Sequence, residues 1–236
     1  MEQNKQAEAA GGNSAIVPVP KLENDFYDWW ERHEQVLALK EAIDPEIVLI
    51  GDSITHMWGG QPVSPIVNGA DSWESLFGGR RVLNLGFGWD RTQNVLWRLQ
   101  HGEMDGISPS VVVINIGTNN TSETANARAN TPAEIQEGVA AICDLVHDKV
   151  PDASIVLMAV FPREQSPDHP RREVIAEINR LRAAFAAERR YAYVDLASQL
   201  LAADGTLPGE IAADYCHPTE RGYRIWADAL RPLLSS

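Results

Sequence analysis

The stretch EIVLIGDSIT, residues 46–55, places a short apolar run directly before a glycine, an acidic residue and a serine. The run has the length of a strand and lacks polar alternation, which indicates a strand that is covered on both faces. Further short apolar runs follow along the chain: RVLNLG (81–86), SVVVINIG (110–117), SIVLMAVF (154–161) and YAYVDL (191–196). The sequence therefore predicts five strands, most of them buried.

Helical patterns separate these runs. The first is DFYDWWERHEQVLALKEA, where apolar residues recur at helical spacing, and Thr131, Pro132 and Glu134 form a start signal for a later helix. The expected later helices cover about 71–78, 91–102, 132–149, 170–190 and 219–233. Strands that alternate with helices predict the α/β class, as a three-layer α/β/α sandwich with a five-stranded parallel sheet. Ligands of such sheets bind outside the carboxyl ends of the strands.

Length and composition indicate one domain. The 236 residues are 44% hydrophobic, which is enough for one sizeable core. Residues 1–22 are polar with Gly, Ala and Pro and no apolar periodicity, so we expect a flexible N-terminal tail followed by a single domain over 23–236.

The net charge of −13 leaves no basic surface for nucleic acid, so no nucleic-acid partner is expected. No apolar run approaches the roughly 20 residues of a membrane span, and the N-terminus lacks the pattern of a secretory signal. The sequence leaves open a cytoplasmic location, export with the leader removed, and the oligomeric state. Cys143 and Cys216 have no partner motif and are expected to be free buried thiols, and no metal site is expected.

Three loops carry residues suited to nucleophilic catalysis. Ser53 follows the first strand, Asn119 follows the third in GTNN, and Asp214 precedes His217 by three positions in DYCHP. A nucleophilic serine needs a base and a group that orients that base, and a carboxamide can hold a developing oxyanion. Each loop also has a local explanation, because Ser, Asn and Asp cap helices and form turns. His217 is the favoured base over His56.

The other histidines lie at polar positions of predicted helices and loops. They are therefore expected to be solvated, and they are His33, His101, His147 and His169.

Together these residues resemble the SGNH hydrolases, the GDSL-type esterases. The four blocks appear in order as GDSIT, NLGFGWD, GTNN and DYCHP, and the likeness covers about residues 45–232. Within the family, residues 84–120 are most similar to the catalytic subunits of platelet-activating factor acetylhydrolase, and bacterial carbohydrate acetylesterases share the scaffold. The resemblance implies the flavodoxin-like SGNH hydrolase fold.

The resemblance also implies roles for individual residues. Ser53 would be the nucleophile, His217 the base and Asp214 the residue that holds the imidazole. The oxyanion would be held by the backbone N–H groups of Ser53 and Trp89 and by the side-chain amide of Asn119.

Trp89 departs from the family pattern, which has glycine at this position. A tryptophan forced to positive φ would cost about 1 to 3 kcal/mol. We expect negative φ at Trp89, because Gly86 and Gly88 can absorb unusual backbone angles. The indole would then narrow the acyl pocket, offer a flat face to a sugar, or only pack. Further expected substrate contacts are Asp52, Gly88, Asn120 and Trp58.

The resulting hypothesis is a serine esterase that hydrolyses short-chain acyl esters, acetyl above all, through an acyl-enzyme intermediate and without a cofactor. Carbohydrate O-acetyl groups are the favoured substrate, because the aromatic-bearing loop over residues 59–73 lies beside the predicted cleft. The alternatives are an acetylhydrolase, lipase or thioesterase that acts on phospholipid-like esters, or a binding protein with impaired catalysis.

Overall fold

A computed structural model describes residues 12–234 of the chain and contains one parallel sheet of five strands in the order β2-β1-β3-β4-β5. The strands are β1 (Ile47–Gly51), β2 (Val82–Gly86), β3 (Val111–Asn115), β4 (Ser154–Met158) and β5 (Ala192–Val194). In register, Gly51 at the end of β1 lies between Gly86 of β2 and Asn115 of β3. The loops after these three strands therefore leave the sheet side by side.

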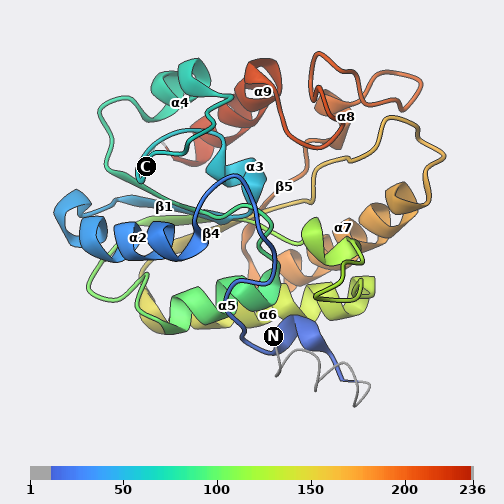
Figure 1. The fold of residues 1–236 in the computed structure, drawn as a ribbon. Helices are drawn as coiled ribbons and strands as arrows, with labels where there is room; N and C mark the ends of the chain where they lie inside the picture. Colours follow the sequence, from blue (N-terminus) through green and yellow to red (C-terminus); the bar gives the residue numbers. More distant parts are fainter. Residues whose placement is uncertain (1–11, 235–236) are drawn as a thin grey trace.

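Helices cover both faces of the sheet (Figure 1). On one side lie α2 (Trp29–Ile43), α5 (Thr92–Gln100), α6 (Pro132–Lys149) and α7 (Pro170–Arg189). On the other lie α4 (Ala70–Phe77), α8 (Ala197–Leu200) and α9 (Glu220–Leu230), while the short α3 (Ser53–His56) follows β1. The predicted three-layer α/β/α sandwich with a five-stranded parallel sheet is confirmed.

Alternate residues of each strand supply two separate cores. Val48 and Ile50 of β1 belong to the core under α2, α5 and α6, whereas Ile47 and Leu49 belong to the core under α4 and α9. All four side chains are at most 1% exposed. This explains why the strands show no polar alternation in the sequence, because both faces of the sheet are covered.

Three predicted strands, those that correspond to β3, β4 and β5, end two or three residues beyond the observed ones. The apolar runs continue through Ile116 after β3 and through Phe161 after β4, and these residues are buried without belonging to the sheet. Hydrophobic pattern reports burial and not strand pairing, so it cannot mark where the pairing ends.

The domain begins earlier than expected. Residues 12–22 of the expected tail pack on the domain: η1 (Ser14–Ile16) contacts α5 and α6, and Ala15 and Val19 are fully buried. The Thr92 hydroxyl donates to Ala15 O over 2.8 Å. The apolar residues of this segment are interrupted by Pro18 and Pro20 and follow neither a helical nor a strand period, which is why the boundary at residue 22 was wrong. The remainder of the expected tail, residues 1–11, lies outside the described residues.

His33 is also not solvated as expected. It is 4% exposed on α2, its ring stacks on Trp29, and its Nδ1 lies 2.8 Å from Oε1 of Glu103. A buried carboxylate partner, invisible in the sequence, keeps this polar ring inside.

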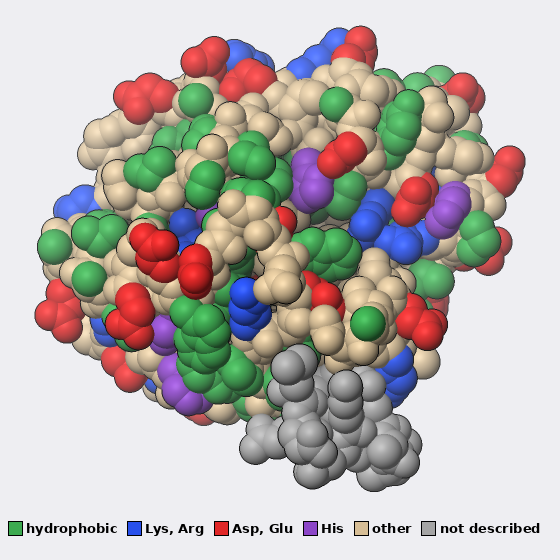
Figure 2. Space-filling model, viewed as in Figure 1, with side chains coloured by type: hydrophobic (Ala, Val, Ile, Leu, Met, Phe, Trp, Pro, Cys, Tyr) green, Lys and Arg blue, Asp and Glu red, His purple; other side chains and the backbone are tan. Residues whose placement is uncertain are grey.

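On the face seen in Figure 2, the described Lys and Arg side chains are separated by acidic and neutral ones. Within residues 12–234, no helix combines the length and the apolar character needed to cross a bilayer.

Candidate active site

Ser53 is positioned by an abrupt change from strand to helix. β1 ends at Gly51, Asp52 caps α3 by accepting the Ile54 N–H over 3.0 Å, and Ser53 is the first residue of that helix. A side chain on Gly51 would start 2.0 Å from Oγ1 of Thr55, so the tight turn requires glycine. Ser53 is 6% exposed and its Oγ reaches a small pocket above the sheet.

The turn before α9 brings two more of the predicted residues to Ser53. Nε2 of His217 lies 2.8 Å from Oγ of Ser53, and Nδ1 of His217 lies 2.6 Å from Oδ2 of Asp214. The second Asp214 oxygen accepts the backbone N–H groups of Cys216 and His217. This arrangement can pass a proton from a hydroxyl to an imidazole whose tautomer a carboxylate fixes.

Burial raises the pKa of Asp214, but the hydrogen bonds from the side chain and backbone of His217, its charge and the Cys216 N–H together lower it further, so the pKa lies below its usual value. Asp214 is therefore ionised at neutral pH. An ionised carboxylate is the form that stabilises an imidazolium.

Three candidate oxyanion donors meet at the same pocket. Ser53, Trp89 and Asn119 all line it, and within residues 12–234 neither the Ser53 N–H nor the Trp89 N–H has an acceptor. The Asn119 amide donates one hydrogen to the carbonyl of Asp90 over 3.0 Å, which leaves its second hydrogen for a ligand. Such a group of donors can stabilise negative charge on a carbonyl oxygen.

Trp89 does not have the expected negative φ. Its φ is 63°, in the left-handed region, while neither Gly86 nor Gly88 has positive φ. Side chains on these glycines would start 2.2 Å from the His56 backbone nitrogen and 1.9 Å from Oδ2 of Asp25, respectively. Gly86 is thus required by close packing against backbone, whereas a side chain at Gly88 would displace the Asp25 carboxylate. The positive φ falls on the tryptophan, at a cost of about 1 to 3 kcal/mol.

The pocket beside Ser53 has a volume of about 80 Å³. Besides the predicted residues it is lined by Asp25, Met57, Arg163 and Cys216. Nη1 of Arg163 is buried without a hydrogen-bond partner among the described residues. Burial raises the pKa of Asp25, against the lowering effects of the Phe26 N–H and of His217.

Sequence reasoning missed these lining residues. Arg163 lies after β4 and could have been found by extending the search to the carboxyl end of that strand. Asp25 precedes the first long helix, and no signal in the sequence relates it to the site.

A second hollow, of about 350 Å³, also touches His217. It is lined by Asn68, Asp214, Thr219 and Glu220 together with apolar neighbours. This hollow and the small pocket share only His217.

Asp52 and Gly88 do not reach the site as expected. Asp52 is 1% exposed and serves as the cap of α3, and burial raises its pKa to about 6 although the Ile54 N–H and His217 act in the opposite direction. Gly88 lies under Asp25, and its carbonyl accepts the Tyr27 hydroxyl over 3.1 Å. Asp52 and Gly88 are adjacent in the sequence to Ser53 and Trp89, yet neither of them lines the pocket beside Ser53.

Asn120 and Trp58 do not line the pocket beside Ser53 either, and both are buried in contacts that hold the fold together. The fully buried Asn120 amide accepts the Thr92 N–H and donates to Gln93 and Asn130, each over 3.0 Å. Trp58 is fully buried and stacks on Trp226, with ring centroids 4.2 Å apart. The expected aromatic rim is therefore wrong for Trp58, which fills the core under α9.

His56 does not contact Ser53. It is 1% exposed, its ring contacts Phe26 and Tyr27, and burial together with the charges of Arg32 and Arg98 lowers its pKa to about 2. It is neutral and enclosed. Within residues 12–234, no three His, Cys, Asp or Glu side chains are grouped as a metal site.

The chain is similar to known proteins over most of its length. The model of the GDSL-like Lipase/Acylhydrolase family matches residues 49–225, a span that runs from β1 into α9 and includes Ser53 and His217. The chain belongs to this family. Human platelet-activating factor acetylhydrolase IB subunit alpha1 is 34% identical over 222 residues, which are 94% of this acylhydrolase and 88% of the human protein.

Solved structures share the fold at lower identity. A putative acylhydrolase from Bacteroides fragilis has a TM-score of 0.69 at 21% identity, covering 89% of this acylhydrolase and 97% of its own chain. A catalytic mutant of Axe2, an acetylxylan esterase from Geobacillus stearothermophilus, has a TM-score of 0.62 at 21% identity. The match covers 80% of this acylhydrolase and 94% of the Axe2 chain. At this identity the likeness concerns the fold alone.

Replacing Trp89 with glycine is expected to relieve the left-handed strain and to open the acyl side of the pocket. The ratio of kcat/KM for p-nitrophenyl butyrate to that for the acetate should rise about tenfold, because one or two methylenes are worth that much in an apolar pocket. Trp97→Phe, an aromatic change away from the pocket, is the control. An unchanged acyl profile would mean that the indole only packs.

Proposed function

We propose that this family member is a serine esterase that removes short acyl groups, acetyl above all, from esters of alcohols with several hydroxyl groups, such as carbohydrates. The observation that carries the proposal is the 2.8 Å contact between Ser53 and His217 at the edge of a pocket of only about 80 Å³.

The reaction proceeds through an acyl-enzyme. Oγ of Ser53 forms a bond to the ester carbonyl carbon while its proton passes to Nε2 of His217, and the carbonyl oxygen becomes an oxyanion held by the donors of Ser53, Trp89 and Asn119. The imidazolium then gives its proton to the departing alcohol as the ester bond breaks. Water attacks the acyl-enzyme by the same steps, which releases the acid and restores Ser53.

The small pocket favours a short acyl group. Its volume of about 80 Å³ is far below the roughly 300–1,000 Å³ of sites that enclose drug-sized ligands. An acetyl group fits this space, whereas a long acyl chain needs room that the pocket does not offer.

The polar surroundings favour a hydroxylated alcohol. The departing alcohol must lie near Nε2 of His217 to receive a proton, and the hollow that also touches His217 is lined by the polar residues Asn68, Thr219 and Glu220. Asp25 and Arg163 add two charged side chains to the lining of the pocket beside Ser53. Sites that pair with substrate hydroxyls reject analogues that lack them.

Acetate release from acetylated xylan, acetylated monosaccharides and an acetyl phospholipid tests this proposal. The two carbohydrate esters should give the highest kcat/KM. Asn68→Ala should lower kcat/KM for them about tenfold, the effect of one lost hydrogen bond, and should affect p-nitrophenyl acetate less. Arg221→Ala, on the exposed surface of α9, is the control variant. Preference for the phospholipid would overturn the carbohydrate assignment.

A second candidate is an acetylhydrolase of phospholipid-like esters. The loop before α4 exposes three aliphatic side chains, Val63 (62%), Ile66 (40%) and Val67 (41%), close in sequence to Asn68 of the hollow beside His217. The human relative at 34% identity bears the name of such an enzyme. If the enzyme acts on phospholipid-like esters, the double variant with Val63→Ser and Val67→Ser should have lower activity on the acetyl phospholipid. Its activity on p-nitrophenyl acetate should be unchanged.

A further inference from the structure

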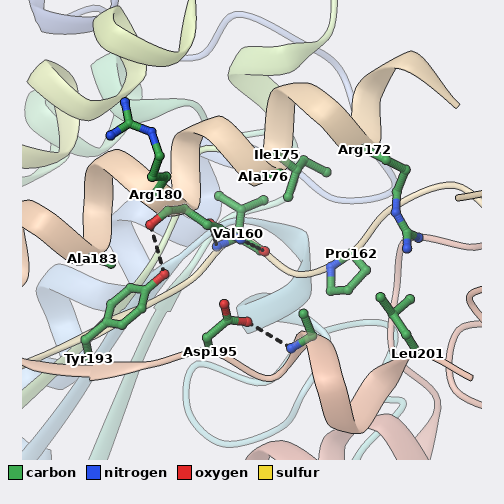
Figure 3. A pocket seen from close by; sticks show the side chains of 12 residues that line it. Val160, Pro162, Arg172, Ile175, Ala176, Arg180, Ala183, Tyr193, Asp195 and Leu201 are labelled. Atoms are coloured by element: carbon green, nitrogen blue, oxygen red, sulfur yellow. Dashed lines mark hydrogen bonds between the residues drawn. The ribbon is translucent and has the colours of Figure 1, made fainter. Parts of the chain in front are cut away.

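A separate pocket of about 440 Å³ lies between α7, the segment that follows β5, and the loop after β4 (Figure 3). No residue that lines it also lines the pocket beside Ser53. Its walls are mostly aliphatic and include Val160, Pro162, Ile175 and Leu201. Its size falls within the range of small-molecule sites, and apolar walls with a few polar groups are typical of them.

Arg172 marks one end of the pocket. Figure 3 shows its side chain reaching from α7 toward Pro162 and Leu201, whereas Arg180 points away. Among residues 12–234, the guanidinium donates only to backbone carbonyls, those of Glu164 over 3.2 Å and Gly205 over 2.7 Å. Burial lowers its pKa, and no described carboxylate acts on it. A half-buried cation without a counter-ion attracts an anionic group.

The other polar side chains that line the pocket limit the number of negative charges that a bound ligand can carry. Asp195 lines the pocket and is exposed, with its carboxylate accepting the Ala197 N–H over 2.9 Å. Arg180 already pairs with Glu177 over 2.7 Å. A second negative group on the ligand would therefore meet Asp195 without a free cation to hold it. The Tyr193 hydroxyl is also occupied, because it donates to the Asn179 carbonyl.

We propose that this pocket binds a monocarboxylate with an apolar tail of medium length, with Arg172 holding the carboxylate and the aliphatic walls covering the tail. The assignment is independent of the reaction at Ser53.

The pocket also shares a wall with the active site. Pro162 lines it, while the next residue, Arg163, lines the pocket beside Ser53. Neighbouring residues of one loop therefore line the two pockets, and a binding experiment must distinguish them.

Isothermal titration of the full chain with octanoate tests the proposal, with Ser53 either free or blocked by an organophosphonate. We expect a Kd on the order of 0.1 mM in both forms. Acetate and inorganic phosphate, which lack the tail, and octylamine, which has the opposite charge, should not bind measurably.

Two substitutions assign the binding to this pocket. Arg172→Gln should weaken octanoate binding about tenfold or more, as expected for a lost charge-assisted hydrogen bond. Arg189→Gln, which removes the same charge from an exposed ion pair on α7, should leave it unchanged. Ala176→Leu fills the pocket from α7 and should also weaken binding, which keeps the test valid if the Arg172 variant is unstable.

Several outcomes would overturn the assignment. These are no binding of octanoate, binding that survives both Arg172→Gln and Ala176→Leu, and binding that disappears when Ser53 is blocked. Equal binding of phosphate would overturn the requirement for a tail.

Discussion

Replacing Ser53 with alanine is expected to lower kcat/KM for p-nitrophenyl acetate by about 10⁴-fold or more while leaving the fold intact. The methyl group retains the backbone N–H of residue 53 but removes the oxygen that lies 2.8 Å from Nε2 of His217. No acyl-enzyme can then form. The measurement is the rate of nitrophenol release, together with mass spectrometry after treatment with an organophosphonate, which should label the native chain once and the variant not at all.

The identity of the base can be tested against the nearest competing histidine. His217→Asn should lose activity to a similar extent, whereas His56→Asn should lose much less, because the enclosed His56 ring contacts Phe26 and Tyr27 and not Ser53. Thermal unfolding of both variants separates loss of activity from loss of folding. Retention of most activity in Ser53→Ala would exclude Ser53 as the nucleophile, and a greater loss in His56→Asn than in His217→Asn would exclude His217 as the base.

The five-stranded sheet could be predicted because it follows from the burial pattern of the strands. The grouping of Ser53, Asn119 and His217 could be predicted because it follows from the parallel topology. Ile47 to Ile50 are buried on both faces, which removes polar alternation, and parallel strands send their following loops to one edge of the sheet. Ser53, Asn119 and His217 were therefore expected to lie near one another, and in the structure all three line one pocket.

The direction of individual side chains could not be predicted, because it depends on contacts between distant segments. Asp52 and Trp58 lie as close to Ser53 in the sequence as residues of a site would, yet one caps a helix and the other fills the core. The positive φ of Trp89 could not be predicted either, because the sequence does not show which residue of this turn takes the unusual backbone angle. The Asp25 side chain that occupies the space beside Gly88 comes from a segment more than sixty positions earlier.

Arg98 is expected to be the residue whose loss most destabilises the fold around the site. Arg98→Leu should lower the free energy of unfolding by about 3 to 5 kcal/mol, the typical effect of leaving buried charges unpaired. Its Nε donates to Oδ2 of Asp90 over 2.7 Å, Nη1 pairs with Glu103, and the guanidinium lies 3.9 Å from the centre of the Phe87 ring. Burial lowers the pKa of Arg98, but Glu103 and Asp90 raise it by more, so the group stays charged.

The same variant should also reduce catalysis at temperatures where it remains folded. Asp90 follows Trp89 directly, its carboxylate is held by Arg98 and by Trp29, and its carbonyl accepts the Asn119 amide. Without Arg98, two of the three oxyanion donors lose a fixed support. A displacement of about 1 Å at such donors costs about 100-fold in rate, so kcat for p-nitrophenyl acetate should fall by that order.

Urea unfolding of Arg98→Leu beside Arg221→Leu measures the effect. Arg221 forms an ion pair with Glu210 on the exposed surface, and its loss should change the free energy of unfolding by less than about 1 kcal/mol. Adding Glu103→Leu to Arg98→Leu should restore part of the loss, because it removes one of the carboxylates left unpaired. If Arg98→Leu behaves like the surface control, the buried charges do not support the turn, and other contacts hold the strained backbone of Trp89, such as those of Tyr27 and Asn119 with its neighbours.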